Sequence, residues 1–232
     1  MSTMESKTVR EVVLENPGAV RVFQELGIDY CCGGQKPLDE ACAAANVSVD
    51  EVLAKMEAGM RVPAAGAPQD WQRESLSRLI EHIHGVHHGF VRRESPRILA
   101  LLEKVCGVHG AHHPELLQVR EAFTALAGEL SAHLMKEEQM LFPYIAGAER
   151  GSAPAACFGS VQNPIRMMMF EHDNAGAVLR ELRRLTNDYA VPSDACPSYQ
   201  TLYQALREFE ADLHQHIHLE NNILFPRAVA LE

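Results

Sequence analysis

Two stretches of this sequence, 83 residues apart, repeat one pattern and decide the fold. They read HLMKEEQMLFP at residues 133–143 and HIHLENNILFP at residues 216–226. Both fit the pattern His-x-x-x-Glu-x-x-(Met/Ile)-Leu-Phe-Pro. Each copy falls in the second helix of an expected helix pair. The repeat therefore predicts two related helical hairpins.

Around these two copies the sequence predicts an all-α protein. Helical stretches are expected at about 72–105, 114–147, 162–189 and 197–230, separated by glycines and prolines. No segment alternates apolar and polar residues for long enough to require a sheet. Four long helices with short connections predict an up-down four-helix bundle.

The bundle is preceded by a smaller unit. Residues 1–62 contain helix-start signals at Thr8, Asn16 and Ser48 and a helix-stop signal at Gly27, which predict a small helical N-terminal domain. Residues 63–70 are rich in proline and small residues and are expected to form a linker. The bundle then occupies residues 71–232. We expect the small domain to be tethered to it rather than fused with it.

Composition excludes several classes of partner. The chain has 232 residues, with 21 basic and 31 acidic side chains and a net charge of −10, so we expect neither nucleic acid nor an anionic membrane as partner. No apolar run is long enough to cross a bilayer, and the first residues lack the pattern of a secretory signal. We therefore expect a cytoplasmic protein whose six cysteines are reduced.

The repeated motif has the chemistry of a metal site. Spacing i, i+4 puts His133 and Glu137 on one face of a helix, and His216 and Glu220 on one face of another. A single such pair is more often a surface His–Glu contact. Two copies in matching apolar contexts favour two halves of one metal centre.

The first helix of each hairpin should supply one more ligand. His172 is the only histidine between residues 134 and 213, and it precedes His216 by 44 residues. Stepping back a similar distance from His133 reaches His88 or His87, and the spacing favours His88 narrowly. His84, one turn before His88, remains a substitute or a neighbour of the ligand.

The resulting donor set has imidazoles and carboxylates but no thiolate, which suits a di-iron or di-manganese pair rather than structural zinc. Six such ligands leave coordination positions open for a bridge and for small molecules. His214 and His218, two residues to either side of His216, are expected to be solvated. The predicted ligands are His88, His133, Glu137, His172, His216 and Glu220.

Cys31 and Cys32 are adjacent and are followed by two glycines, between one expected helix end and the next helix start. A helix N-terminus lowers the pKa of a nearby thiol and makes it a better nucleophile and metal ligand. The alternative is a pair of buried apolar thiols. Because adjacent cysteines cannot both point into one small core, we expect this pair to be functional. The remaining cysteines are expected to be structural.

Together, these motifs resemble a known family. The sequence DYCCGG at residues 29–34, the linker and the two bundle motifs are similar to the RIC (repair of iron centres) di-iron proteins, the YtfE/ScdA type of iron–sulfur cluster repair protein with a hemerythrin-like domain. The resemblance covers nearly the whole chain. It implies two non-haem irons per chain, oxo- or hydroxo-bridged. It also favours His88, since the family's first ligand lies six residues after a His (His82) and four before an Arg (Arg92).

The resemblance also implies a role. The family restores iron–sulfur clusters damaged by nitric oxide or oxidants, so we expect damaged iron–sulfur proteins as partners and a repair or iron-donor protein rather than a turnover enzyme. It implies a cytoplasmic stress-response protein that forms a homodimer. The alternative is a hemerythrin-like sensor or carrier of nitric oxide or dioxygen, or a nitric oxide reductase. A carrier would not need the Cys31–Cys32 domain and would retain its iron, whereas a donor would release it.

Overall fold

The computed structural model describes residues 7–60, 69–152 and 158–232, and within these ranges it contains helices and no β-strand. The predicted all-α class is confirmed. Most of the predicted linker, residues 63–70, lies outside the described residues. In the described part of the chain, no helix is both long and apolar enough to cross a membrane.

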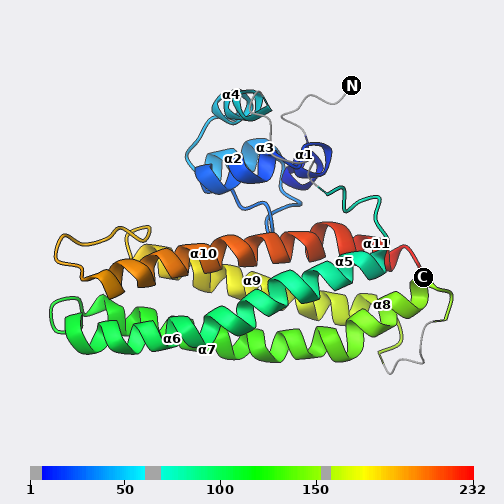
Figure 1. Ribbon diagram of the computed structural model, residues 1–232. Coiled ribbons are helices and arrows are strands. Elements are labelled where there is room, and N and C mark those ends of the chain that lie inside the picture. Colours follow the sequence, from blue (N-terminus) through cyan, green and yellow to red (C-terminus); the bar gives the residue numbers. More distant parts are fainter. Residues whose placement is uncertain (1–6, 61–68, 153–157) are drawn as a thin grey trace.

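Four long helical rods form an antiparallel bundle (Figure 1). They begin and end within a few residues of the predicted stretches. Three of the rods contain a short π-helical turn, labelled η, that the sequence analysis did not predict. In chain order the segments are α5 (Leu76–His82), η2 (Ile83–His88) and α6 (Gly89–His109); α7 (Glu115–Lys136), η3 (Glu137–Leu141) and α8 (Phe142–Glu149); α9 (Gln162–Leu185); and α10 (Pro197–Leu219), η4 (Glu220–Leu224) and α11 (Phe225–Val229).

Within residues 7–60, the small N-terminal domain contains four short helices, and several of their ends follow local signals. Thr8 and Glu11 form a reciprocal capping box at the start of α1, and Gly27 ends α2 with a φ of 71°. Ser48 accepts a hydrogen bond from the Glu51 N–H at the start of α4. The helices are α1 (Val9–Glu15), α2 (Ala19–Leu26), α3 (Leu38–Ala44) and α4 (Val49–Met60).

The bundle core has two apolar clusters with a polar layer between them. One cluster includes Phe123, Leu130 and Phe209, and the other includes Ile83 and Phe225. The predicted metal ligands lie along the helices between residues of the two clusters. Since both clusters exclude water, the polar layer is held at a fixed depth inside the bundle.

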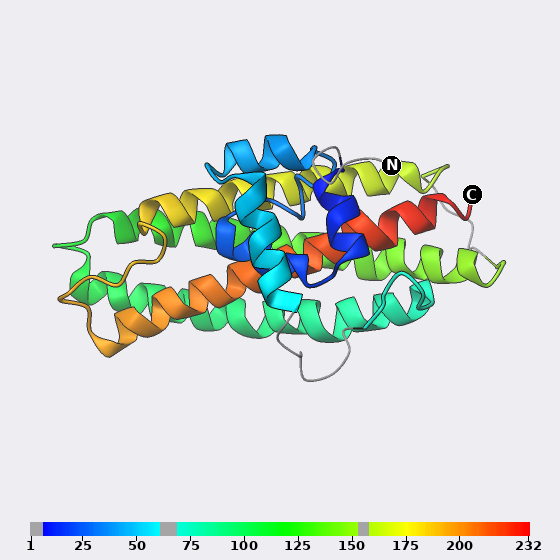
Figure 2. The same cartoon turned by 90° about the horizontal axis from the view of Figure 1, so that it is seen from above.

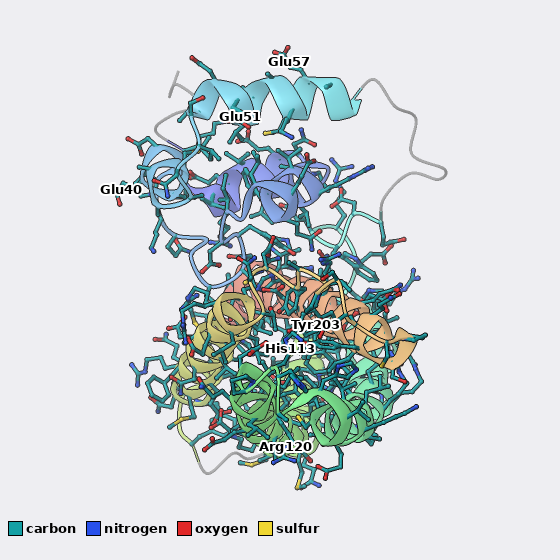
Figure 3. All side chains as sticks on the ribbon, turned by 90° about the vertical axis from the view of Figure 1, so that its left-hand side faces the viewer. Glu40, Glu51, Glu57, His113, Arg120 and Tyr203 are labelled. Carbon is teal, nitrogen blue, oxygen red and sulfur yellow. The ribbon has the colours of Figure 1, made fainter. Side chains whose placement is uncertain are left out.

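The N-terminal domain lies directly against the bundle, beside α9 and α10 (Figures 1 and 2). Arg10 Nε donates to the Asn222 carbonyl oxygen at 3.1 Å, and Asn222 Nδ2 donates to the Tyr30 carbonyl oxygen at 3.1 Å. Figure 3, viewed along the bundle, shows the domain standing on one side of it, with Glu51 and Glu57 on its outer helix. In this structure hydrogen bonds therefore dock the domain on the bundle, a contact that the sequence analysis did not predict; most of the linker expected to tether the two parts lies outside the described residues.

Candidate metal centre

The six predicted ligands converge in the polar layer of the bundle. His88 Nε2 lies 3.2 Å from His216 Nε2, and His133 Nε2 lies 3.0 Å from His172 Nε2. The side chains form two groups of potential ligands that share both carboxylates. The groups are His88, Glu137, His216 and Glu220, and His133, Glu137, His172 and Glu220.

The geometry separates His88 from the neighbouring histidines that the sequence left open. His88 is fully buried and its Nε2 lies 3.4 Å from Glu137 Oε2. The His87 ring turns away, with Nδ1 3.0 Å from Asp212 Oδ1. His84 is exposed and approaches Glu138 rather than the centre. The structure therefore places His88, and neither alternative, in the ligand layer.

Each π-helical turn lies at a ligand. Glu137 is the first residue of η3 and Glu220 the first of η4, while His88 is the last residue of η2. Such turns often occur at functional sites, because the wider turn shifts the side chains that follow it relative to an α-helix. For η3 and η4 the signal in the sequence was the proline of each Leu-Phe-Pro, whereas η2 has no such motif. A proline has no N–H for the carbonyl group four residues earlier, so the regular α-helical ladder is interrupted there.

Polar neighbours hold three of the four imidazoles. Glu138 Oε1 lies 2.7 Å from His88 Nδ1, Glu171 Oε2 lies 2.8 Å from His133 Nδ1, and Asn221 Oδ1 lies 2.8 Å from His172 Nδ1. An Nδ1–H that donates to oxygen leaves the Nε2 lone pair free for a metal. The sequence analysis did not identify Glu138, Glu171 or Asn221. Their signal was adjacency, since each follows or precedes a ligand directly.

The donor set fits a pair of cations. Both oxygens of Glu137 and both of Glu220 are buried without an aligned hydrogen-bond partner. Buried carboxylate oxygens are normally satisfied, and leaving them without a partner costs several kilocalories per mole unless a cation binds. Imidazole nitrogens and carboxylates in a four-helix bundle are ligands that iron accepts.

Electrostatics supports the same interpretation. Burial, helped by the nearby charge of Glu220, raises the pKa of Glu137 to about 8. Burial also works against ionisation of Glu220, but His216, His172 and His88 hold the pKa of that carboxyl well below its usual range. The two carboxylates thus cannot both ionise easily without added positive charge, which bound metal ions would supply.

Cys31 and Cys32 lie beside this centre but differ from the expectation. Their Sγ atoms are 3.8 Å apart, and Cys32 Sγ is 3.5 Å from the His172 carbonyl oxygen. The predicted lowering of the thiol pKa is wrong for Cys31. Its hydrogen bond with Cys32, its burial and the nearby Asp29 carboxylate raise the pKa of Cys31 well above its usual value.

His214 and His218 also differ from the expectation. They were predicted to be solvated, but His218 is buried and His214 is half-buried. Both rings pack against Tyr30 of the N-terminal domain, with ring centroids 6.2 Å and 5.5 Å away. Neither ring faces the ligand layer. Instead of being solvated, the surface of α10 that carries them is covered by the docked domain.

Comparisons with known proteins agree with both parts of the chain. Residues 78–228 match the family model described as a hemerythrin HHE cation binding domain, and residues 5–59 match ScdA_N, described as a domain of unknown function.

Whole-length relatives are also found. A protein of Haemophilus influenzae named "Probable iron-sulfur cluster repair protein" is 37% identical over 219 residues, which cover 94% of this chain and 95% of that protein. A Pectobacterium atrosepticum protein named "Iron-sulfur cluster repair protein YtfE" is 36% identical over 223 residues, 96% of each chain. A Yersinia pestis protein of the same name is 36% identical over 213 residues, 92% of each chain.

Proposed function

We propose that this chain restores damaged iron–sulfur clusters by supplying iron. The chain belongs to the family of iron–sulfur cluster repair proteins, which join a ScdA-type N-terminal domain to a hemerythrin HHE domain. The proposed substrates are proteins whose clusters nitric oxide or oxidants have damaged. Iron is then the cargo, and two ions per chain would be held by the His88–His216 and His133–His172 pairs, with Glu137 and Glu220 belonging to both groups. Cytoplasmic location and a homodimer stay predictions.

The observation that carries the proposal is the place of the two thiols. Cys32 Sγ touches the backbone of the ligand His172, at 3.5 Å from its carbonyl oxygen. Asp29, Cys31 and Cys32 bring ligand atoms within 4.8 Å of one another, so they form a third group able to hold a cation, separate from the two in the bundle. A sensor or carrier of a small gas has no use for soft ligands at this position.

The ligands of the bundle are harder than those of the Cys31–Cys32 loop, and this difference favours transfer of iron from the bundle to the loop. The bundle offers carboxylate oxygen and imidazole, whereas the loop adds two sulfurs. Sulfur is also the donor by which cysteines hold iron in an iron–sulfur protein, so the loop resembles the acceptor more than the bundle does. On binding ferrous iron, each thiol would release its proton to solvent and form an Fe–S bond as a bond from iron to a bundle carboxylate or imidazole breaks, and the iron would stay divalent. The raised pKa of Cys31 keeps its thiol protonated until a cation arrives.

The test is repair by the iron-loaded protein. An iron–sulfur dehydratase is inactivated with nitric oxide and then incubated with the wild type or with the double variant Cys31→Ser/Cys32→Ser. We expect the double variant to bind iron normally but to restore little activity. Cys196→Ser, which changes a half-buried thiol far from the centre, is the matched control and should repair normally. Repair at the wild-type rate by the double variant would favour the sensor or carrier function.

A further inference from the structure

The two halves of the centre have different surroundings. His88 and His216 are both fully buried. His216 stacks on His87, with ring centroids 5.7 Å apart and planes inclined by 8°. His88 packs face to face on Phe142 at 5.5 Å. Aromatic and imidazole rings therefore cover this half of the ligand layer.

In the other half Phe225 stacks on His172 at 6.0 Å and both imidazoles are buried, but this half also borders a pocket between α7 and α9. The pocket has a volume of about 300 Å³, and both His133 and His172 line it. Its walls include buried Leu130 and Ala175, while exposed Glu129 and Phe170 are nearer the surface. A ferrous ion entering from solvent by this pocket would reach the His133–His172 group first.

Two carboxylates lie at the α7–α9 pocket. Glu129 lies one helical turn before His133 on α7, and Glu171 Oε2 lies 2.8 Å from His133 Nδ1. Lys136 pairs with Glu171 and neutralises one of the two charges, which leaves a net negative charge at the entrance. Oxygen donors suit hydrated ferrous iron, which exchanges its waters for ligands one at a time.

We propose that the α7–α9 pocket is the loading entrance for aqueous divalent iron, and that the position held by His133 and His172 fills first. This inference rests on the proposed function, because only a protein that gives up iron needs repeated loading. In the step itself, iron–water bonds are replaced by bonds to carboxylate oxygen and then to His133 Nε2. The iron remains divalent and the displaced waters return to solvent.

Loading and discharge then lie on different sides of one helix. His172 is on α9, between the carboxylate-bearing pocket that faces α7 and the Cys31–Cys32 pair of the docked domain. Hydrated iron meets hard oxygen ligands on the way in, and soft sulfur ligands lie on the opposite side. The arrangement keeps incoming iron away from the thiols until the bundle has bound it.

The experiment measures metal uptake by the metal-free full-length protein in stopped flow, with Co²⁺ as a coloured probe that air does not readily oxidise. Ala132→Phe places a ring at the pocket lining, and Ser131→Phe adds the same ring about 100° round the helix, outside the lining. We expect Ala132→Phe to load several-fold more slowly and still reach the wild-type stoichiometry. Equal rates for the two variants would overturn the proposal.

Two further pairs of variants locate the first position and the role of charge. In the His88→Ala background, which keeps the His133–His172 group, the Ala132→Phe change should still slow uptake. In the His133→Ala background the same change should have no effect. Glu129→Gln should slow loading more than Glu121→Gln, an equal loss of charge two turns away. The reverse result in either pair would contradict the proposal.

These outcomes are separate from those of the repair test, because no damaged protein is present during loading. Normal repair together with loading that does not depend on the pocket would contradict only the proposal that the α7–α9 pocket is the loading entrance. Pocket-dependent loading without repair would defeat only the proposed function.

Discussion

At the scale of single residues, the centre depends on two carboxylates that the fold buries beside imidazoles but without an aligned hydrogen bond. Glu137 and Glu220 are fully buried, and each belongs to both groups of ligands. A buried polar group that serves folding alone is normally hydrogen-bonded. These two residues are therefore explained by a ligand, and not by the stability of the metal-free protein.

Replacing one carboxylate by its amide tests that explanation. Glu137→Gln keeps the shape of the side chain and removes a charge that both metal positions share, so we expect most of the iron to be lost. The metal-free variant should unfold at a temperature no lower than the metal-free wild type, because no aligned hydrogen bond is lost. Metal analysis and thermal unfolding measure the two effects. Full iron content in Glu137→Gln would contradict the bridging role.

A second residue-scale prediction concerns His113, which lies just before α7 and is labelled in Figure 3. Its Nδ1 lies 3.0 Å from Glu115 Oε1 and its Nε2 3.1 Å from Asp194. Hydrogen bonding to Asp194 raises the pKa of His113 above its usual value, and Glu115 adds to the effect. A raised folded-state pKa stabilises the fold fully below the unfolded value of about 6.5, and this contribution is lost as pH rises through the folded value.

The measurement compares His113→Gln with the wild type in denaturant across pH. The free energy of unfolding of the wild type should exceed that of His113→Gln most near pH 6, and this difference should shrink toward about pH 9. Gln118→Ala, which changes an exposed residue without a titratable group, is the control and should show no such trend. If this difference in the free energy of unfolding grew with pH, His113 beside Asp194 would not bind its proton more tightly in the folded state than in the unfolded state.

At the scale of elements, the π-helical turns are the feature that positions the ligands. Pro226 cannot donate to the Asn222 carbonyl oxygen four residues earlier, and Arg10 of the N-terminal domain donates to that oxygen instead. The turn that begins at Glu220 is thus joined to both the proline and the docked domain.

Pro226→Ala tests whether the proline maintains η4. An alanine N–H can satisfy the Asn222 carbonyl and allow an α-helical turn, which would rotate Glu220 relative to His216. We expect weaker iron binding, measured by competition with a chelator, with no loss of helix content by circular dichroism. Pro197→Ala, at the first position of α10, is the control and should bind iron normally. Unchanged affinity in Pro226→Ala would show that packing alone holds the turn.

Much of this architecture was predictable because it is encoded locally. The cap at Thr8, the stop at Gly27 and the i, i+4 pairs report on neighbours in sequence, and the structure agrees with them. The π-helical turns were not predicted, since they shift the helical register by one residue and leave the apolar pattern almost intact. The partners of the imidazoles required the rotamers of Glu138 and Glu171, which spacing does not specify.

At the scale of the whole molecule, the docked domain could not be predicted because its contacts join residues almost two hundred positions apart. Asn222 Nδ2 donates to the Tyr30 carbonyl, and Gly34 allows a close approach, because a Cβ there would lie 2.7 Å from Asn222 Oδ1. The buried positions of His214 and His218 depend on this docking. Sequence patterns describe which helix face is apolar but not which polar face another domain will cover.

Docking makes a prediction about thiol reactivity. Cys31 is buried and has a raised pKa, whereas hydrogen bonding to His109 lowers the pKa of the half-buried Cys196. Because the thiolate is the reactive form, iodoacetamide should modify Cys196 before Cys31 in the metal-free protein at about pH 7.5. Mass spectrometry of digested peptides gives the order.

Removing a docking contact should change that order. Arg10→Ala loses the hydrogen bond to the Asn222 carbonyl, so modification of Cys31 should become faster while that of Cys196 stays the same. If Arg10→Ala leaves Cys31 equally protected, the domain is held by its other contacts and the Arg10 hydrogen bond contributes little to docking.

Asn221 joins the metal ligand His172 to the backbone of Cys31, with one amide oxygen 2.8 Å from the imidazole and the amide nitrogen 3.4 Å from the Cys31 carbonyl oxygen. A single side chain thus takes part in two equilibria, filling of the bundle and seating of the thiol loop. Thermodynamic reciprocity requires that the factor by which metal strengthens seating equals the factor by which seating strengthens metal binding. If the chain supplies iron as proposed and bound metal strengthens seating of the loop, a client protein that draws the loop away will weaken iron binding by that same factor.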